Sequence, residues 1–453
     1  MAHCSLLLKC RNEDLLRCSF ICHRFFSTQR VLNKKKGNDS VPVFDYGAPS
    51  EKTRRVYAWG VAETGALGNY TSKLKQKMKK LAEFYHHPIR LNFSLLYQVY
   101  DITCGYGFTA FTVEPNLLKG PHKVFGCGVN TDSQIGYHAP RKGHPLAMLM
   151  NPGPIEIPFK NFKTKVIGLA AGRAHLLVLT DEEGVFTLGN NAYGQCGRPV
   201  IADENYVGSR NIHCIPDVSG SRIRSVACGQ DHSMFITQNG DVYACGWNAD
   251  GQTAQNNFES HFELRRVTGD IEGEDIVKVS SAGDCVLALN RKGEVFGWGN
   301  SEYGQLERHT LQLSTSKHLK STTHLGKIVD VAAGGSFCMV LNEHGQVFVW
   351  GYGILGKGPK AQKSDEPTEI PSVLFGKNKF QPDVKVTSIA CGVHHLAALT
   401  NSGDLYTWGH NRGGCLGQGH EKDQFFPLKV AIGAVTLKVC CGVDHMVALC
   451  KPF

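Results

Sequence analysis

Apolar residues along this chain occur in short runs that are separated by polar turns containing glycine. The stretch 223–237 ends in Gln238-Asn239-Gly240, and a second β-rich run follows at 241–246. Two such runs around a glycine turn predict a β-hairpin, with the glycine at positive φ. A Gly-Gln turn comes next, at 251–252. The pattern therefore predicts a small antiparallel meander in each unit.

Two signatures repeat along the chain at intervals of about 50 to 70 residues. The first is Cys-Gly-x-x-His at 228–232, 391–395 and 441–445, and the second is Trp-Gly at 298–299, 350–351 and 408–409. With degraded copies included, the first signature has its glycine position at Gly105, Gly172, Gly229, Ala282, Gly334, Gly392 and Gly442. The second signature ends at Gly60, Gly128, Gly189, Gly246, Gly299, Gly351 and Gly409. This regular alternation indicates a repeat architecture.

The order of the signatures indicates how the repeat is closed. The chain opens with a second-signature strand at 56–60 and finishes with a first-signature strand at 439–449. The two ends are therefore expected to complete one blade, which removes the exposed edges that an open sheet must protect. We predict an all-β protein whose residues 55–453 form a seven-bladed β-propeller, closed by pairing of the N- and C-terminal strands.

Composition agrees with this fold class and limits the chemistry. The chain is 42% hydrophobic and has 50 glycines in 453 residues, as expected for a folded, turn-rich protein. No apolar run reaches the roughly 18 residues of a transmembrane segment. No catalytic set of side chains stands outside the repeat phase, so we expect no enzyme activity, cofactor or metal. Four cysteines share one phase and are expected to be small buried side chains that point away from one another: Cys104, Cys228, Cys391 and Cys441.

The first 36 residues differ from the rest because they are basic. Their charged residues are Lys9, Arg11, Arg17, Arg24, Arg30 and Lys34 to Lys36, against Glu13 and Asp14. Since apolar residues are scattered among these charges, we predict a mitochondrial presequence rather than a secretory signal, with a basic tail as the alternative. Arg24-Phe25-Phe26-Ser27 favours cleavage after Phe26. The expected organisation is a presequence (1–26), a linker (27–54) and the propeller.

The propeller signatures resemble those of the regulator-of-chromosome-condensation family, over roughly residues 55–453. With the presequence and the stretches 351–358 and 441–446, the resemblance extends to the mitochondrial member of that family. It implies guanine-nucleotide exchange on the mitochondrial dynamin-like fusion GTPase. It also implies ribosome biogenesis through the large-subunit rRNA, with rRNA-pseudouridylation and ribosome-assembly proteins, in the matrix or peripherally on the inner membrane. The alternative is a purely structural scaffold for rRNA modification and ribosome assembly.

One repeat position supplies a candidate site for a protein partner. It directly precedes the His of the first signature and is occupied by Gly107, Ala174, Asp231, Asp284, Ser336, His394 and Asp444. The resemblance implies that this position lies near the central funnel, where the nuclear relative meets its GTPase. We predict a partner-facing ring of surface side chains made by Asp231, Asp284, His394 and Asp444. The alternative is that these polar side chains cap the local backbone.

A basic insertion at 70–98 supplies a second candidate surface. Its lysines are Lys73, Lys75, Lys77, Lys79 and Lys80. The spacing of Leu74, Met78, Leu81 and Tyr85 predicts a short amphipathic helix. Five clustered lysines attract RNA phosphates or an anionic membrane leaflet. The alternative is a solvated loop.

Three further patterns are interpreted as structural. His175, His232, His395 and His445 share a phase with Phe108, Cys285 and Phe337, which indicates packed core positions rather than a metal or catalytic site. The stretch 351–358 resembles a phosphate-binding loop, but the sequence after it is typical of a loop and not of the required helix, so we predict a blade turn. The nuclear relative inserts a hairpin wedge into its GTPase, whereas the longest excursions here (70–98, 138–163 and 198–220) show no compact hairpin pattern.

Overall fold

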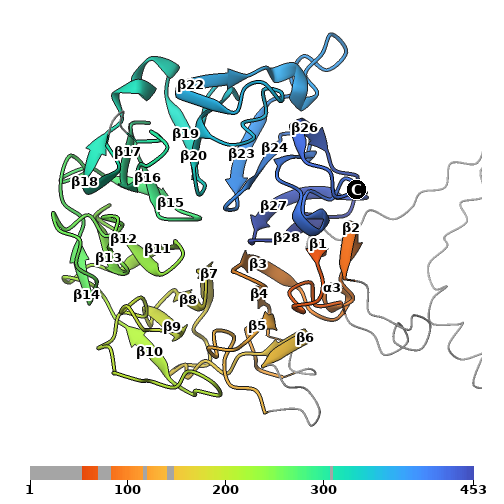
Figure 1. Ribbon diagram of the computed structural model, residues 1–453. Helices are drawn as coiled ribbons and strands as arrows, with labels where there is room; N and C mark the ends of the chain where they lie inside the picture. The colour runs from red at the N-terminus through yellow and green to blue at the C-terminus, as the bar shows by residue number, and fades with distance from the viewer. Residues whose placement is uncertain (1–53, 70–82, 116–119, 140–146, 307–309) are drawn as a thin grey trace, which may run out of the picture. The chain divides into compact units, whose positions relative to one another are not determined.

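Seven four-stranded antiparallel sheets form a closed ring around a central channel (Figure 1). The computed structural model describes residues 54–69, 83–115, 120–139, 147–306 and 310–453. The predicted seven-bladed propeller is therefore confirmed, and six of its blades are meanders in which consecutive strands pair side by side. The presequence and most of the linker lie outside the described residues, so their boundaries stay predictions.

The blades are numbered here in chain order, and the inner strand of each is named first. Blade 1 is β3 (Val99–Cys104), β4 (Phe108–Val113), β5 (Val124–Val129) and β6 (Met148–Pro154). Blade 2 is β7 (Val166–Ala171), β8 (His175–Thr180), β9 (Val185–Gly189) and β10 (Ile212–Ile215). Blade 3 is β11 (Ile223–Cys228), β12 (His232–Thr237), β13 (Val242–Gly246) and β14 (His261–Arg266).

The second half of the ring repeats this plan. Blade 4 is β15 (Ile276–Ser280), β16 (Cys285–Asn290), β17 (Val295–Asn300) and β18 (Gln312–His318). Blade 5 is β19 (Ile328–Ala333), β20 (Phe337–Asn342), β21 (Val347–Tyr352) and β22 (Lys363–Ile370). Blade 6 is β23 (Val386–Cys391), β24 (His395–Thr400), β25 (Leu405–Gly409) and β26 (Gln424–Lys429). Short helical turns stand between strands at η1 (Lys320–Leu325), η2 (Ser372–Phe375) and η3 (Arg412–Gly414).

Blade 7 is assembled from both ends of the propeller. It consists of β27 (Val435–Cys441), β28 (His445–Lys451), β1 (Arg55–Val61) and β2 (Phe84–Arg90). β1 pairs with β28 from Arg55 opposite Cys450 to Gly60 opposite His445. The predicted closure by the two terminal strands is confirmed, and Figure 1 shows β1 and β28 side by side.

The predicted insertion at 70–98 is partly wrong. Residues 84–90 are β2, the outer strand of blade 7, and a single helical turn, α3 (Phe93–Leu96), follows. The predicted amphipathic helix therefore cannot extend to Tyr85, because Tyr85 pairs with Gly60 in a sheet. Pairing with β1 satisfies the backbone groups of this segment, which outweighs a helical spacing of only four apolar residues. The five lysines lie outside the described residues.

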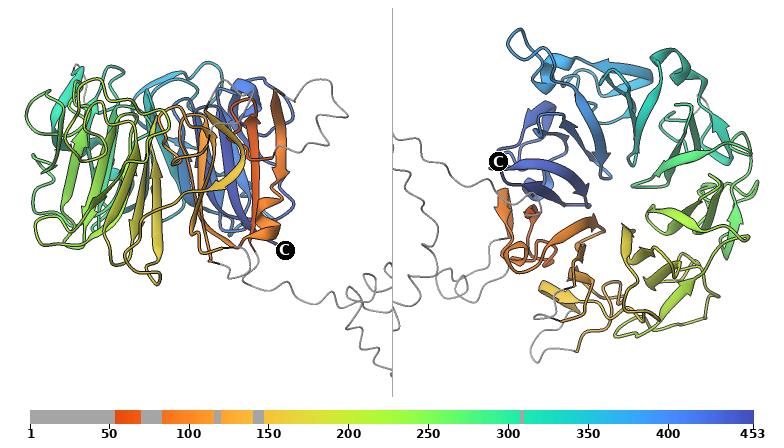
Figure 2. Two further views of the ribbon diagram at one scale, coloured as in Figure 1. Left: turned by 90° about the horizontal axis from the view of Figure 1, so that it is seen from below. Right: turned by 180° about the vertical axis from the view of Figure 1, so that it is seen from behind.

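Every inner strand runs in the same direction along the channel. We call the end where the inner strands begin the lower mouth and the end where they finish the upper mouth. The first signature forms the turn from inner to second strand, so all its copies lie at the upper mouth. The connections from each outer strand to the next inner strand lie at the lower mouth. The side view in Figure 2 shows these two loop-bearing faces.

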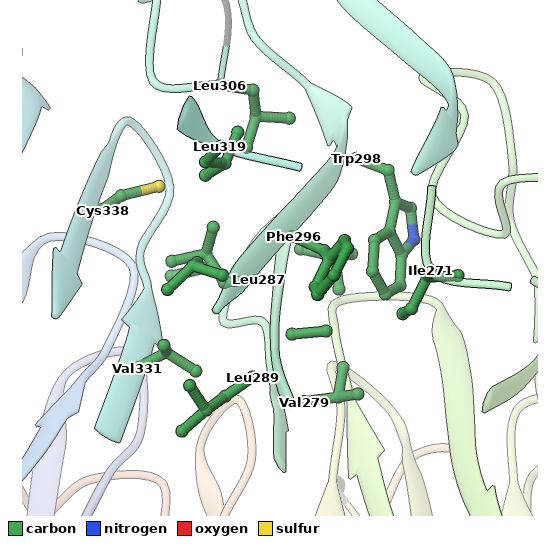
Figure 3. Packing of buried hydrophobic residues seen from close by; sticks show 14 of the residues in the cluster. Ile271, Val279, Leu287, Leu289, Phe296, Trp298, Leu306, Leu319, Val331 and Cys338 are labelled. Atoms are coloured by element: carbon green, nitrogen blue, oxygen red, sulfur yellow. The ribbon is translucent and has the colours of Figure 1, made fainter. Parts of the chain in front are cut away.

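The second signature and the Gly-Gln turn join neighbouring blades. Trp298 of blade 4 donates its indole N–H to the carbonyl of Gln252 in blade 3 at 2.8 Å. Trp350 donates to Gln305 at 2.7 Å between blades 5 and 4, and Trp59 donates to Cys415 at 2.8 Å between blades 7 and 6. Each bond satisfies a buried indole donor that would otherwise be costly. The indole nitrogen of Trp408 in blade 6 has no such partner among the described residues. In Figure 3, Trp298 lies beside Phe296 and Ile271, between blade 4 and the connection from blade 3.

The glycine of the second signature is required by a close approach. Gly299 has φ of +90°, and a Cβ there would lie 2.3 Å from the carbonyl oxygen of Asp284. Gly246 is similar, with φ of +110° and 2.5 Å to the oxygen of Asp231. The sequence prediction that the hairpin glycines adopt positive φ is also confirmed, for example at Gly240 with φ of +86°.

Candidate partner-binding site at the upper mouth

The four predicted ring residues lie at the upper mouth in two neighbouring pairs. Asp231 and Asp284 belong to blades 3 and 4, in the turns after β11 and β15. His394 and Asp444 belong to blades 6 and 7, in the turns after β23 and β27. The structure thus places all four at one end of the channel, because each occupies the same turn of its blade.

Asp231 is not the surface side chain that the sequence predicted. Its exposed fraction is 7%, and its carboxylate pairs with Arg173 of blade 2 through bonds of 2.5 and 3.1 Å. Burial raises the pKa of Asp231, the Arg173 guanidinium lowers it, and Asp284 raises it further. The carboxylate therefore joins two blades, which is neither local backbone capping nor a freely exposed charge.

Asp284 has a related position between blades 3 and 4. Its carboxylate accepts a hydrogen bond from the side-chain amide of Gln252 at 3.0 Å. Burial raises the pKa of Asp284, and the Gln252 bond and Arg173 oppose this shift. The Gly-Gln signature thus positions a ring residue as well as an indole, because the carbonyl of Gln252 binds Trp298 while its amide binds Asp284.

Tyr106 is an upper-mouth residue that the sequence reasoning missed. Its hydroxyl donates a hydrogen bond to the carbonyl of Ala282, which joins the turns of blades 1 and 4 at 3.2 Å. Burial raises the pKa of Tyr106 first, and the charges of Asp284 and Asp231 raise it further. The only signal in the sequence was a large aromatic side chain at a variable position of the first signature.

The second pair of ring residues lines a cavity of about 440 Å³ between blades 6 and 7. Besides His394 and Asp444, its polar lining includes His410, Arg412 and Asp423. Nδ1 of His410 is 2.9 Å from a carboxylate oxygen of Asp423, and Nε of Arg412 is 3.6 Å from one of Asp444. The rings of His394 and His410 lie edge to face, with 6.0 Å between their centroids.

Protonation in this cavity is set mainly by partial burial. Burial lowers the pKa of His394, the neighbouring His410 lowers it further, and Asp444 opposes both. Burial raises the pKa of Asp444, which Arg412 and His394 oppose. The cavity therefore offers an exposed guanidinium and two imidazole rings beside carboxylates, a set that can receive a charged side chain. Sequence reasoning missed His410 and Arg412 because they belong to the turn after β25, outside the first signature.

The four core histidines are buried, as predicted. Burial lowers the pKa of His175, His232 and His395 to about 3 and that of His445 to about 4. Nε2 of His175 is 3.0 Å from the hydroxyl of Ser233, so this ring has a polar partner. Among the residues that the structure describes, His232 has no hydrogen-bond partner at either ring nitrogen, and it packs on Gly229, where a Cβ would lie 2.0 Å from the ring. These imidazoles are uncharged core side chains.

The prediction for the cysteines is half wrong. Cys104 and Cys228 are buried, whereas Cys391 and Cys441 are only partly so. Residues of all four positions line one cavity of about 280 Å³ in the central channel. Each cysteine nevertheless packs against a different hydrophobic cluster of the ring, as expected of equivalent positions in different blades. Burial raises the pKa of each thiol, so the four stay protonated and are free of disulfides.

The glycine-rich stretch and the long excursions are parts of blades. Gly351, Gly353, Gly356 and Gly358 all have positive φ, and strand β22 follows at Lys363–Ile370. The predicted blade turn is therefore confirmed. The excursions 138–163 and 198–220 contain the outer strands β6 and β10. Within the described part of the chain, no helix is both long enough and apolar enough to span a membrane.

Comparison with known proteins assigns the propeller to a family. Residues 50–371 match the model of the RCC1-like domain, and residues 344–399 and 402–449 match the regulator of chromosome condensation (RCC1) repeat. The chain belongs to the RCC1-like family. Its family relatives include proteins named RCC1-like G exchanging factor-like protein, from mouse at 44% identity and from human at 42%. The mouse match covers 91% of both chains, and the human match covers 91% of this chain and 90% of the human one.

A solved member of this RCC1-like family has the same architecture. The crystal structure of human WBSCR16 is 42% identical to this chain, with a TM-score of 0.81. The match covers 88% of this chain and 99% of the human one. Fold and family are therefore established for the RCC1-like chain over nearly its whole propeller, and its relatives are named for nucleotide exchange.

Proposed function

We propose that this RCC1-like chain is a non-catalytic mitochondrial regulator that binds the mitochondrial dynamin-like fusion GTPase and promotes release of its GDP. An exchange factor acts by binding the nucleotide-free GTPase more tightly than the GDP-bound form. It needs a pre-formed surface and no catalytic residues. The names of the RCC1-like relatives support exchange, and the predicted presequence supports the mitochondrial address.

The observation that carries this proposal is the cavity between blades 6 and 7. Arg412 has an 81% exposed side chain, although Asp444 is only 3.6 Å from it. His394 is exposed beside it, and the cavity volume of about 440 Å³ has room for a side chain of a partner. Asp231 and Asp284 are held by Arg173 and Gln252, so they shape the mouth rather than offer free charges.

The test measures release of a fluorescent GDP analogue from the purified GTPase. Replacing Arg412 and His394 by Ala should slow the stimulated release by about tenfold, because a truncated central contact typically costs 1 kcal/mol or more. Arg265→Ala is the control, since that arginine also has an accessible side chain, 46% exposed, but lies on the outer strand β14. If the wild-type chain does not stimulate release at all, the exchange proposal is wrong.

A second candidate function is assembly of the mitochondrial large ribosomal subunit, with rRNA-pseudouridylation and ribosome-assembly proteins as partners. One observation favours RNA contact. Tyr303 and Tyr352, both exposed, stack at 5.5 Å with an interplanar angle of 13°, beside Lys363 in a cavity of about 550 Å³. Exposed aromatic rings near a cation are the platforms on which single-stranded bases stack.

Crosslinking to large-subunit rRNA in mitochondria distinguishes this scaffold role from exchange. Tyr352→Ala and the quintuple Lys→Gln variant of Lys73, Lys75, Lys77, Lys79 and Lys80 should each reduce crosslinking while GDP release is unchanged.

Sequencing the N-terminus of the mitochondrial protein, and extracting it from inner membranes with carbonate, tests the matrix or peripheral inner-membrane location. An intact Met1 in the mature protein contradicts the presequence.

A further inference from the structure

The inner strand of every blade contains a β-bulge at one repeat position. The register shifts between Val99 and Asp101 in blade 1, and at the equivalent place in the other six blades. The bulged residues are Tyr100, Ile167, Arg224, Val277, Val329, Thr387 and Leu437. A bulge re-aims a side chain and is a specific structural feature rather than a defect. All seven lie near the start of an inner strand, and therefore at the lower mouth.

Five of the seven bulged residues are large, exposed and apolar. Their exposed fractions are 49% for Tyr100, 52% for Ile167, 36% for Val277, 46% for Val329 and 38% for Leu437. We call these five residues the lower collar. Their neighbours one position earlier are buried or half-buried, so exposure here follows the bulge and not a general lack of packing. Exposed apolar side chains that recur around one opening indicate a binding surface.

Basic side chains flank the lower collar on four of the seven blades. Two residues before the bulge, blades 2, 3, 5 and 6 carry Lys165, Arg222, Lys327 and Lys385, all exposed. No ion pair involves these four side chains among the described residues. In blade 4 the same position is Asp275, which is neutralised by Arg224 at 2.8 Å and Arg291 at 2.6 Å.

The charged side chains just inside the collar differ from these four basic residues, because each has an ion-pair partner. One residue after the bulge, Lys278 pairs with Asp330, and Lys438 pairs with Asp101. The charged side chains just inside the lower collar are therefore paired, and the collar itself is apolar. The four basic side chains outside it have no ion-pair partner among the described residues. A ligand that complements the lower mouth is apolar at its centre and negatively charged at its periphery.

We propose that the lower collar binds a short segment of a protein partner in which apolar side chains are flanked by carboxylates. A segment of chain fits better than a bilayer because the collar residues are only about half exposed. Phe162 and Phe380, on loops of the same face, are exposed by 83% and 96%. A flat bilayer meets such loop tips first, whereas a protruding segment reaches the channel rim. This site is separate from the upper-mouth cavity and does not depend on nucleotide exchange.

The experiment measures fluorescence anisotropy of three labelled heptapeptides with the full-length chain. The first has Leu-Phe-Leu flanked by two glutamates on each side, the second has lysines as flanks, and the third has Ser-Gly-Ser at its centre. The first should bind at least tenfold more tightly than the others. The double variant Ile167→Ser/Val329→Ser should weaken it by about tenfold, and Lys327→Gln/Lys385→Gln should weaken it less and flatten its salt dependence.

The matched control is Val207→Ser/Leu311→Ser, which removes apolar side chains with 64% and 69% exposure from loops of the upper face. It should bind the first peptide as the wild type does, and all variants should keep the wild-type melting temperature. Equal affinity for the three peptides, or no loss in the collar variant, overturns the proposal. The proposal is also overturned if no peptide binds and the chain instead binds phosphatidylglycerol vesicles or polyuridylate in a way that the collar variant abolishes.

Discussion

The two mouths of the channel are built from the same seven inner strands, yet they differ in which of their charged side chains have partners. At the upper mouth, Asp231 and Asp284 are held by side chains of the preceding blade. At the lower mouth, Lys327 and Lys385 have no ion-pair partner among the described residues. Ion pairs between blades also occur at the lower mouth, where Lys278 pairs with Asp330 and Arg224 pairs with Asp275. The lower mouth differs because the four basic side chains outside its collar have no carboxylate partner within the described residues, so they stay available to a ligand.

Blade 7 closes the ring that forms both mouths, so disrupting this blade should have the largest effect. Deleting residues 439–453 removes β28 and the end of β27, and leaves β1 paired only with β2. We expect loss of the cooperative unfolding transition and aggregation, because two blade edges become exposed. Circular dichroism melting and light scattering measure this outcome. Deleting only Pro452 and Phe453, which lie outside the strands, is the control and should leave melting unchanged. Native melting of the long deletion contradicts the closure.

Acid should destabilise the upper end through its buried histidines. Burial lowers the pKa of His175, His232 and His395 to about 3 and of His445 to about 4, so below about pH 6.5 the unfolded chain binds protons that the folded chain does not. The free energy of unfolding should then fall by up to about 1.4 kcal/mol per pH unit for each histidine, between pH 6.5 and 4. Denaturant titrations at several pH values measure the slope.

His232→Phe sharpens this prediction. Phe337 already occupies the equivalent site of blade 5 and packs on Gly334 as His232 packs on Gly229. The substitution removes two ring nitrogens that lack hydrogen-bond partners, so stability at pH 7 should stay the same or rise. The acid slope should lose about one proton's contribution. An unchanged slope shows that His232 is not the titrating group.

A matched pair of substitutions compares the mouths directly. Asp231→Ala leaves Arg173, whose side chain is 48% exposed, without its carboxylate and should reduce the free energy of unfolding by about 1 kcal/mol. Val329→Ser changes a half-exposed bulge residue and should change it by no more than about 0.5 kcal/mol. Urea titration measures both. An equal decrease in the free energy of unfolding for both variants would mean that the lower collar also stabilises the fold, which contradicts its assignment as a binding surface.

Sequence reasoning predicted the positions that every blade needs and missed those that depend on two blades. The glycine at 299 and the tryptophan at 298 were recognised because the repeat itself requires them. Arg412 and Tyr106 were missed, since each gains its role from a residue of another blade. Tyr85 was assigned to a helix because its apolar spacing was read without the strand that pairs with it.

The sequence by itself determined the number of blades, the closure by the terminal strands and the positions of the turns, because these follow from local patterns repeated in phase. Only the tertiary structure decided the surroundings of each equivalent side chain. Asp231 is buried against Arg173, and Val329 is exposed by a bulge. Such relations depend on how strands surround a common axis and on register shifts between them. A linear pattern specifies neither, because contacts between blades join residues that are far apart in the chain, such as Gln252 and Asp284, 32 positions apart, or Arg173 and Asp231, 58 positions apart.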